Sequence, residues 1–281
     1  MPNIFFGRRL LIATKHGKEK VIAPLLENEI GVCCFVATNF DTDELGTFTG
    51  EIIRKDDPLT TLREKCLKAA AASKCDLVVA SEGSFGPHPL YFFIPCNEEI
   101  LMLVDIKNNM EIWAKEISTE TNFNGSVVTD WPALKAFSER ANFPSHALIL
   151  RKSKDDYTGM VKGINDYTAL ENQFNILQKK FGAAYVETDM RAMHNPLRME
   201  VIKKAAIKLS NKLLSNCPEC ECPGFDISEI KSGLPCASCN FPTKSTAALI
   251  YSCNRCGHTV EKKFPNSKRT EDPMYCDVCN P

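Results

Sequence analysis

Eight cysteines in the last quarter of the chain are spaced for metal binding. They form four Cys-x-x-Cys pairs: Cys217 and Cys220, Cys236 and Cys239, Cys253 and Cys256, and Cys276 and Cys279. Such a pair places two sulfurs on one side of a tight turn, a knuckle, and two knuckles complete a tetrahedral site for zinc. The sequence therefore predicts two Zn²⁺ ions, both structural, because a site closed by four thiolates has no open position for a substrate.

The spacing also bears on which knuckles share an ion. The gaps between Cys220 and Cys236 and between Cys256 and Cys276 fall in the zinc-ribbon range of roughly 15 to 20 residues. We therefore expect the first knuckle to pair with the second and the third with the fourth, as two tandem zinc ribbons. An interleaved pairing is the alternative. A disulfide framework competes as well, but nothing in the sequence indicates secretion.

A second group of candidate residues follows the first apolar strand. Thr14, Lys15 and Lys18 lie between this strand and a helix, where open α/β sheets bind ligands. Free amides at a helix start, two lysines and a hydroxyl favour a bound phosphate. An exposed polar turn is the simpler interpretation of the same residues.

Carboxylates in two further segments could hold magnesium. Glu82 follows the apolar strand 77–80 in a stretch rich in glycine and serine, and it could bind Mg²⁺ or act as a general base. Asp43 and Glu51 lie in the acidic segment 40–51 and could provide further oxygen ligands to the same ion. The competing interpretations are a wide turn held by glycine and proline for the first segment, and a solvated loop for the second.

Three charged residues lie between a late strand and a long helix. We expect Asp189 to act as a base or second metal ligand, Arg191 to stabilise developing charge and Arg198 to bind phosphate. The alternative is a network of caps and salt bridges at the start of the helix.

Alternating apolar strands and amphipathic helices predict an α/β domain over residues 1–216, with a mixed sheet and helices on both faces. A small tandem zinc-ribbon domain follows over residues 217–281. The expected helices are 18–28, 60–72, 131–141, 167–181 and 196–216. The expected strands are 9–13, 31–36, 76–80, 90–95, 100–105, 111–117, 146–150 and 183–187.

Bulk properties exclude several classes of protein. The chain has 281 residues and a formal net charge of −1, so no overall attraction to nucleic acid or anionic membranes is expected. The tail holds seven basic against eight acidic residues, and only 262–269 forms a basic patch, which argues against nucleic acid as the main partner. No apolar run approaches the length of a membrane span, and the start lacks the order of a signal peptide, so we expect a cytoplasmic protein. The sequence does not indicate an oligomeric state.

Several segments together resemble an uncharacterised, mostly bacterial family with an α/β domain and a C-terminal double zinc ribbon. These segments are 13–19, 40–51, 81–89, 118–123 and 187–199. The first strand, loop and helix are also similar to those of inosine-triphosphate-pyrophosphatase-like nucleotide hydrolases. The chain departs from that pattern because its first loop lacks asparagine and no second acid stands beside Glu82. This second resemblance implies a fold and a nucleotide substrate.

The leading functional hypothesis is a metal-assisted hydrolase or transferase that acts on a phosphate-bearing small molecule, such as a nucleotide. The alternative is a non-enzymatic module whose ribbon engages a protein or a nucleic acid.

Overall fold

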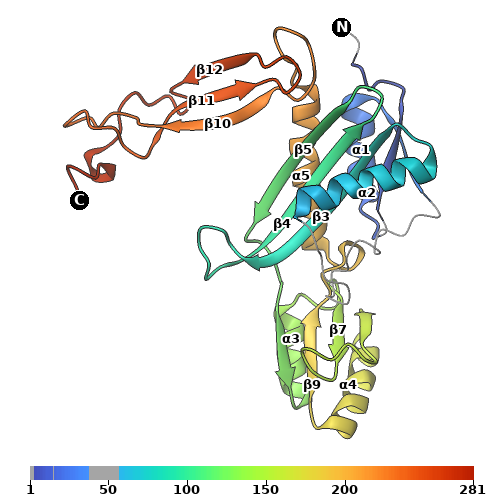
Figure 1. The fold of residues 1–281 in the computed structure, drawn as a ribbon. Coiled ribbons are helices and arrows are strands. Elements are labelled where there is room, and N and C mark those ends of the chain that lie inside the picture. Colours follow the sequence, from blue (N-terminus) through green and yellow to red (C-terminus); the bar gives the residue numbers. More distant parts are fainter. Residues whose placement is uncertain (1–2, 15, 38–56) are drawn as a thin grey trace. The chain divides into compact units, whose positions relative to one another are not determined.

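The chain folds into two compact units, Met1–Ser210 and Asn211–Pro281 (Figure 1). The computed structural model describes residues 3–14, 16–37 and 57–281. The long helix α5, Pro196–Leu214, carries the chain from the first unit into the second.

A five-stranded mixed sheet forms the centre of the first unit. Its order is β2-β1-β3-β4-β5, with bounds Cys33–Val36, Arg9–Ala13, Leu77–Pro87, Pro95–Asp105 and Met110–Ser118. Strand β1 pairs in parallel with both β2 and β3, whereas β3, β4 and β5 form an antiparallel meander. This confirms the predicted mixed sheet.

Helices cover both faces of this sheet, as predicted. Helix α2, Pro58–Ser73, packs on one face, and α1, Glu19–Ile30, and α5 pack on the other (Figure 1). Two neighbouring residues of β3 contact helices on different faces. Ser81 contacts Lys18 at the start of α1, and Glu82 contacts Lys65 of α2. Successive side chains of a strand point to opposite faces, so the two contacts lie on opposite sides of the sheet.

Aspartates define where three helices of the first unit begin. Asp57, Asp130 and Asp166 each precede a helix and accept hydrogen bonds from backbone amides of its first turn. These amides have no partner within the helix, so a carboxylate at this position accepts their hydrogen bonds. Its negative charge also interacts favourably with the positive end of the helix dipole.

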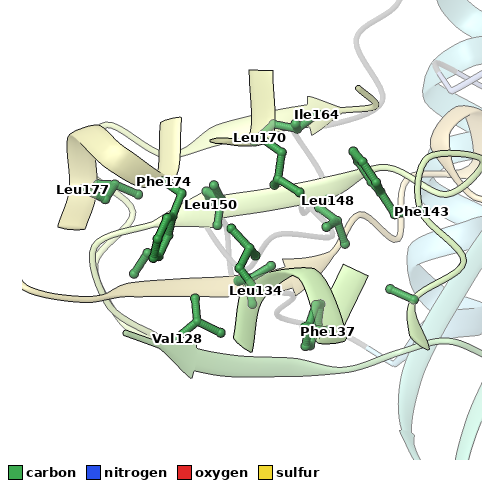
Figure 2. Close-up of a cluster of buried hydrophobic side chains, with 13 residues drawn as sticks. Val128, Leu134, Phe137, Phe143, Leu148, Leu150, Ile164, Leu170, Phe174 and Leu177 are labelled. Atoms are coloured by element: carbon green, nitrogen blue, oxygen red, sulfur yellow. The ribbon is translucent and has the colours of Figure 1, made fainter. Parts of the chain in front are cut away.

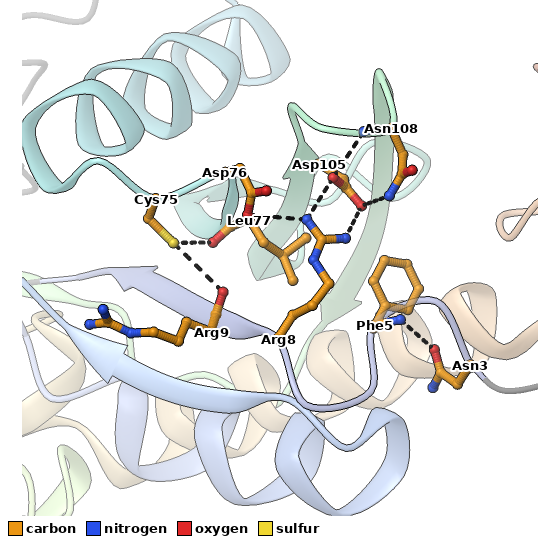
Figure 3. Close-up of polar contacts among 9 residues, drawn as sticks. All are labelled: Asn3, Phe5, Arg8, Arg9, Cys75, Asp76, Leu77, Asp105 and Asn108. Carbon is orange, nitrogen blue, oxygen red and sulfur yellow. Dashed lines mark hydrogen bonds and ion pairs between the residues drawn. The ribbon is translucent and has the colours of Figure 1, made fainter.

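A buried ion pair holds the sheet at the end where its parallel strands begin (Figure 3). Arg8 donates two hydrogen bonds to the fully buried carboxylate of Asp105, at 2.5 and 2.9 Å, and a third to Asp76 at 3.2 Å. Burial would raise the pKa of Asp105, but the hydrogen bonds from Arg8 and Asn108 bring it below its usual value. This pair fixes β1 against the β3–β4 hairpin.

A second, four-stranded antiparallel sheet completes the first unit, and the sequence did not predict it. Its order is β6-β9-β7-β8, with bounds Gly125–Val128, Ala184–Thr188, Leu148–Arg151 and Val161–Ile164. Helices α3, Trp131–Arg140, and α4, Tyr167–Phe181, pack on it through a cluster of aliphatic and aromatic side chains (Figure 2). Strands β6 and β8 have four residues each, too few for a clear periodic pattern.

The predicted strand 90–95 is wrong. Residues 88–94 form the turn that joins β3 to β4, closed by hydrogen bonds from His88 N to Ile94 O and from Ile94 N to Tyr91 O. The side chain of His88 accepts two backbone amides of the same turn. Apolar composition suggested a buried strand, but four of these apolar side chains are exposed.

The second unit is built on a three-stranded antiparallel sheet of order β10-β11-β12. Its strands are Asp226–Ser232, Thr246–Ser252 and Thr259–Lys263. None of the described helices in either unit combines the length and apolar composition that a membrane span requires.

Candidate functional site

The eight knuckle cysteines of the second unit gather into two groups of four. Within each group all sulfurs lie within 4.8 Å of one another: Cys217, Cys220, Cys253 and Cys256 in the first, and Cys236, Cys239, Cys276 and Cys279 in the second. Sulfurs on a tetrahedral zinc ion, at about 2.3 Å from the metal, are about 3.8 Å apart. Two sulfur–sulfur distances in each group are 3.6 to 3.9 Å, so each group has the geometry to hold one zinc ion.

All four knuckles repeat one backbone turn. In each knuckle the residue after the second cysteine donates its amide to the carbonyl of the first cysteine, at 2.8 to 3.0 Å. Three of these residues, Glu221, Asn240 and Gly257, have a left-handed backbone. The amides of Ser238 and Arg255 point at the sulfurs of Cys236 and Cys253 at 3.4 Å, as donors around a thiolate should.

The predicted pairing of the knuckles is wrong. The first knuckle pairs with the third, and the second with the fourth. The strand arrangement explains this, because β10 and β11 run in opposite directions and Asp226 faces Ser252 across the sheet. The start of β10 and the end of β11 therefore lie together, and so do the knuckles beside them. The second and fourth knuckles meet at the opposite end, about 20 Å away at the usual rise per strand residue.

In the first unit, the candidate phosphate and acid residues lie where the strand order reverses. Strand β2, which follows β1 and α1 in the chain, lies on one side of β1 in the sheet. Strand β3, which comes later, lies on the other side of β1. Crevices at such a topological switch point, beyond the carboxyl ends of the parallel strands, are where open α/β sheets bind ligands. The parallel pairing of β1 and β3 ends at Ala13 and Ala80, immediately before Thr14 and Ser81.

Lys18 and Ser81 meet at this switch point. The Lys18 Nζ donates to the Ser81 Oγ at 2.8 Å, and both side chains are buried. Burial lowers the pKa of Lys18 to about 7, and the nearby charge of Arg198 acts in the same direction. The hydroxyl of Thr14 is buried with no hydrogen-bond partner among the described residues.

Glu82 is buried on the opposite face, in an ion pair with Lys65. It lines a small pocket together with Glu98, whose carboxylate pairs with Lys115 at 3.2 Å. Among the described residues, the two cysteine groups are the only clusters of three or more side chains suited to a metal. No described carboxylates, Glu82 and Glu98 included, form such a cluster.

Arg198 is held on the face that carries Ser81. Its Nε donates to Glu99 Oε1 at 2.6 Å, and its Nη1 donates to the carbonyl of Met190. Gly83 leaves room for this pair, because a side chain there would collide with Glu99 and lie 2.6 Å from Arg198 Nη2. The predicted phosphate ligand is thus fully buried and engaged in an ion pair.

Asp189 and Arg191 pair with one another. The Asp189 carboxylate accepts three hydrogen bonds from the side chain and one from the amide of Arg191, at 2.6 to 3.2 Å, and one from the amide of Gly163 at 3.0 Å. Five hydrogen bonds from four donor atoms to a fully buried carboxylate suit a structural clamp better than a general base.

The switch point therefore brings Lys18 to Ser81 beside the end of β1 at Thr14, and it places Arg198 close enough to influence Lys18. Glu82 lies on the opposite face of the sheet. Asp189 and Arg191 connect to the switch point through Met190, whose carbonyl Arg198 contacts, and through Asn195, whose side chain contacts the carbonyl of Asp189 and the amide of Arg198. Lys15, Asp43 and Glu51 lie outside the described residues.

Two residues of this cluster escaped the sequence analysis. Lys65 stands on the buried face of α2, four residues from both Thr61 and Ala69, a spacing that marks a lysine facing the core. Glu99 precedes a run of apolar strand residues and alternates with Leu101 and Leu103 on one face. A charged residue at a position whose spacing predicts burial needs a partner of opposite charge. This spacing was the sequence feature that could have identified Lys65 and Glu99.

Comparison with known families matches residues 65–281 to a domain of unknown function, DUF6671. A search of curated proteins found no match. The matched segment runs from α2 through both cysteine groups, in agreement with the expected uncharacterised family with a zinc-binding tail. The chain belongs to the DUF6671 family.

Proposed function

We propose that the switch point between β1 and β3 binds a phosphate-bearing small molecule, such as a nucleotide, and that the protein is a metal-assisted hydrolase or transferase acting on it. The two cysteine groups hold structural zinc in this proposal. The resemblance of the first strand, loop and helix to inosine-triphosphate-pyrophosphatase-like hydrolases is part of the same proposal.

The observation that carries the proposal is the contact of Lys18 with Ser81 at the switch point. A lysine with a pKa of about 7 exists in both protonation states near neutral pH. Its ammonium form can bind a phosphate oxygen, and its amine form can accept a proton from a hydroxyl or a water molecule. The hydroxyl of Thr14, which has no partner among the described residues, provides a further donor.

We assign different roles to the other charged residues. Arg198 positions Glu99 and contributes positive charge to the surroundings of Lys18, and Asp189 with Arg191 supports the start of α5. Glu82 would act only if its pair with Lys65 opens.

The purified protein should be screened for phosphate and pyrophosphate release from nucleoside triphosphates and sugar phosphates, with and without Mg²⁺. We expect Lys18→Met to abolish the activity that appears, whereas Lys20→Met, an exposed lysine two residues later, should leave it unchanged. Glu82→Gln should be compared with Glu64→Gln, an exposed glutamate on the same helix as Lys65. Activity that survives Lys18→Met would contradict the proposal.

Sulfate binding, measured by calorimetry, tests the site without assuming a reaction. Sulfate stays dianionic between pH 6 and 8, so a change in its affinity reports on the protein. The proposal predicts weaker binding as Lys18 loses its proton, and no binding to Lys18→Met. An affinity that is independent of pH and of Lys18 would show that the switch point is not an anion site.

The alternative, a binding module without catalysis, has one observation in its favour. All residues of β12 are exposed, including Lys262 and Lys263, so this strand offers an accessible edge with positive charge. Salt-dependent retention of the protein on DNA or RNA, lost when both lysines are changed to Met, would support the alternative.

A further inference from the structure

A pocket of the first unit lies away from the switch point. It has a volume of about 540 Å³ and lies between the β3–β4 turn and the four-stranded sheet. Phe92 and Phe93 of the turn line it on one side, and Arg151, Tyr185 and Glu187 line it on the other. A volume of this order suits a small organic ligand. None of Lys18, Glu82 and Arg198 lines it.

Arg151 is the unusual residue of this pocket. Its side chain is buried, with 4% of its surface exposed, and its Nη2 donates to Glu187 Oε2 at 2.8 Å. The Nε and Nη1 atoms are buried with no partner among the described residues. Buried donors on a charged group are costly when left unsatisfied, so they point to a missing acceptor.

The surroundings hold the guanidinium of Arg151 in place. Its central carbon lies 4.6 Å from the ring centre of Tyr157 and 5.1 Å from that of Tyr185. By contrast, both terminal nitrogens of Arg8 bond to carboxylates, and that arginine needs no further acceptor. Arg151 is thus oriented by Glu187 and two rings, and two donors remain for another molecule.

Exposed aromatic rings form the opposite wall. Phe92 is 82% and Phe93 74% exposed, and Phe123, which also lines the pocket, is 42% exposed. Ring faces that do not pack in the core offer stacking surface for a planar ligand. Large aromatic side chains gathered on an exposed surface commonly mark an interaction site.

The charges that line the pocket balance. Arg151 and Lys154 are positive, whereas Asp155 and Glu187 are negative. A simple inorganic anion would gain little from such a pocket, because the two carboxylates oppose it. Binding therefore requires both an anionic group at the unsatisfied donors of Arg151 and an apolar surface for the rings.

We propose that this pocket binds a planar aromatic small molecule that carries one anionic oxygen group, a carboxylate or a phosphate. The anionic oxygens accept hydrogen bonds from Nε and Nη1 of Arg151, a geometry that a guanidinium offers to paired oxygens. The planar ring packs against Phe92, Phe93 and Phe123. This site is independent of the reaction proposed at the switch point.

Calorimetry with matched probes tests the proposal. Indole-3-carboxylate and phenyl phosphate represent the two anionic groups, and indole-3-carboxamide keeps the first ring but has no charge. We expect at least one of the two anionic probes to bind. If indole-3-carboxylate binds, its affinity should be at least tenfold higher than that of indole-3-carboxamide. Preference for phenyl phosphate over the carboxylate would identify phosphate as the anionic group.

Variants then assign the binding to this pocket. Arg151→Met should weaken the bound probe at least tenfold, and Phe93→Ala, which alters an exposed residue, should weaken it several-fold without affecting folding. Arg63→Met is the matched control, because Arg63 is exposed and pairs with Glu111 outside the pocket. Should Arg151→Met fail to fold, Phe93→Ala still decides the question, and so does the comparison of the two indoles where the carboxylate binds. Failure of both anionic probes to bind, equal affinity for the two indoles where both bind, or full affinity of the bound probe in Phe93→Ala would overturn the proposal.

Discussion

Arg198 Nε donates a hydrogen bond to Glu99 Oε1 at 2.6 Å, and neither side chain has any exposed surface. Opposite this pair, on β3, stands Gly83, which pairs with Glu99 across the two strands. The glycine is therefore a steric requirement of the ion pair.

Replacing Gly83 with alanine should destabilise the first unit by about 3 kcal/mol, because the new methyl group must displace a buried charge pair. Both tryptophans, Trp113 and Trp131, belong to this unit, so urea unfolding followed by tryptophan fluorescence reports on it alone. Gly86→Ala is the control, since a side chain there would meet nothing within 4 Å. Equal stability of the two variants would contradict this account.

The ion pair of Arg8 with Asp105 should contribute far more than an exposed pair. Arg8→Met leaves a fully buried carboxylate without its partner, which typically costs 3–5 kcal/mol, so we expect a loss of about that size. Arg63→Met removes an exposed partner of Glu111 and should cost less than about 1 kcal/mol. The same fluorescence measurement compares them, and similar losses would argue against a structural role for Asp105.

Zinc content can establish how the knuckles pair. We expect two zinc ions per chain in the native protein. The double variant of Cys217→Ser and Cys253→Ser should retain one ion, because both residues belong to the same group. The double variant of Cys217→Ser and Cys236→Ser should lose both ions.

Elemental analysis of freshly purified protein would reveal the opposite result if adjacent knuckles shared an ion. Cys222→Ser serves as the control, because Cys222 lies outside both groups and its loss should leave two ions bound.

Burial of Lys18 should make stability depend on pH. The folded state holds this lysine at a pKa of about 7, below its ordinary value of 10.5, so between these values the unfolded state binds the extra proton. The free energy of unfolding contributed by Lys18 therefore rises with pH across this window, by up to about 1.4 kcal/mol per pH unit. Below pH 7 the full cost of the buried charge remains.

Urea unfolding of the native protein and of Lys18→Met at pH 7, 8 and 9 checks this prediction. The difference in stability between them should shift in favour of the native protein as pH rises. A constant difference would mean that Lys18 titrates normally in the folded protein.

The sequence by itself determined the features that depend on neighbouring residues. Asp57, Asp130 and Asp166 begin helices because a carboxylate satisfies amides within the next three residues. The cysteine knuckles are equally local, since each is a turn of a few residues. The mixed sheet with helices on both faces followed from strands and helices that alternate along the chain.

Tertiary structure decided everything that joins distant segments. Antiparallel strands placed the first knuckle beside the third, which residue spacing alone could not indicate. Glu99 and Arg198 are 99 residues apart, and only the packing of α5 on β4 shows that the arginine has a buried partner. The unsatisfied donors of Arg151 depend likewise on the tyrosines and the glutamate that surround it. Local rules describe how a residue shapes its own turn, whereas charge pairing and metal sites depend on which strands become neighbours.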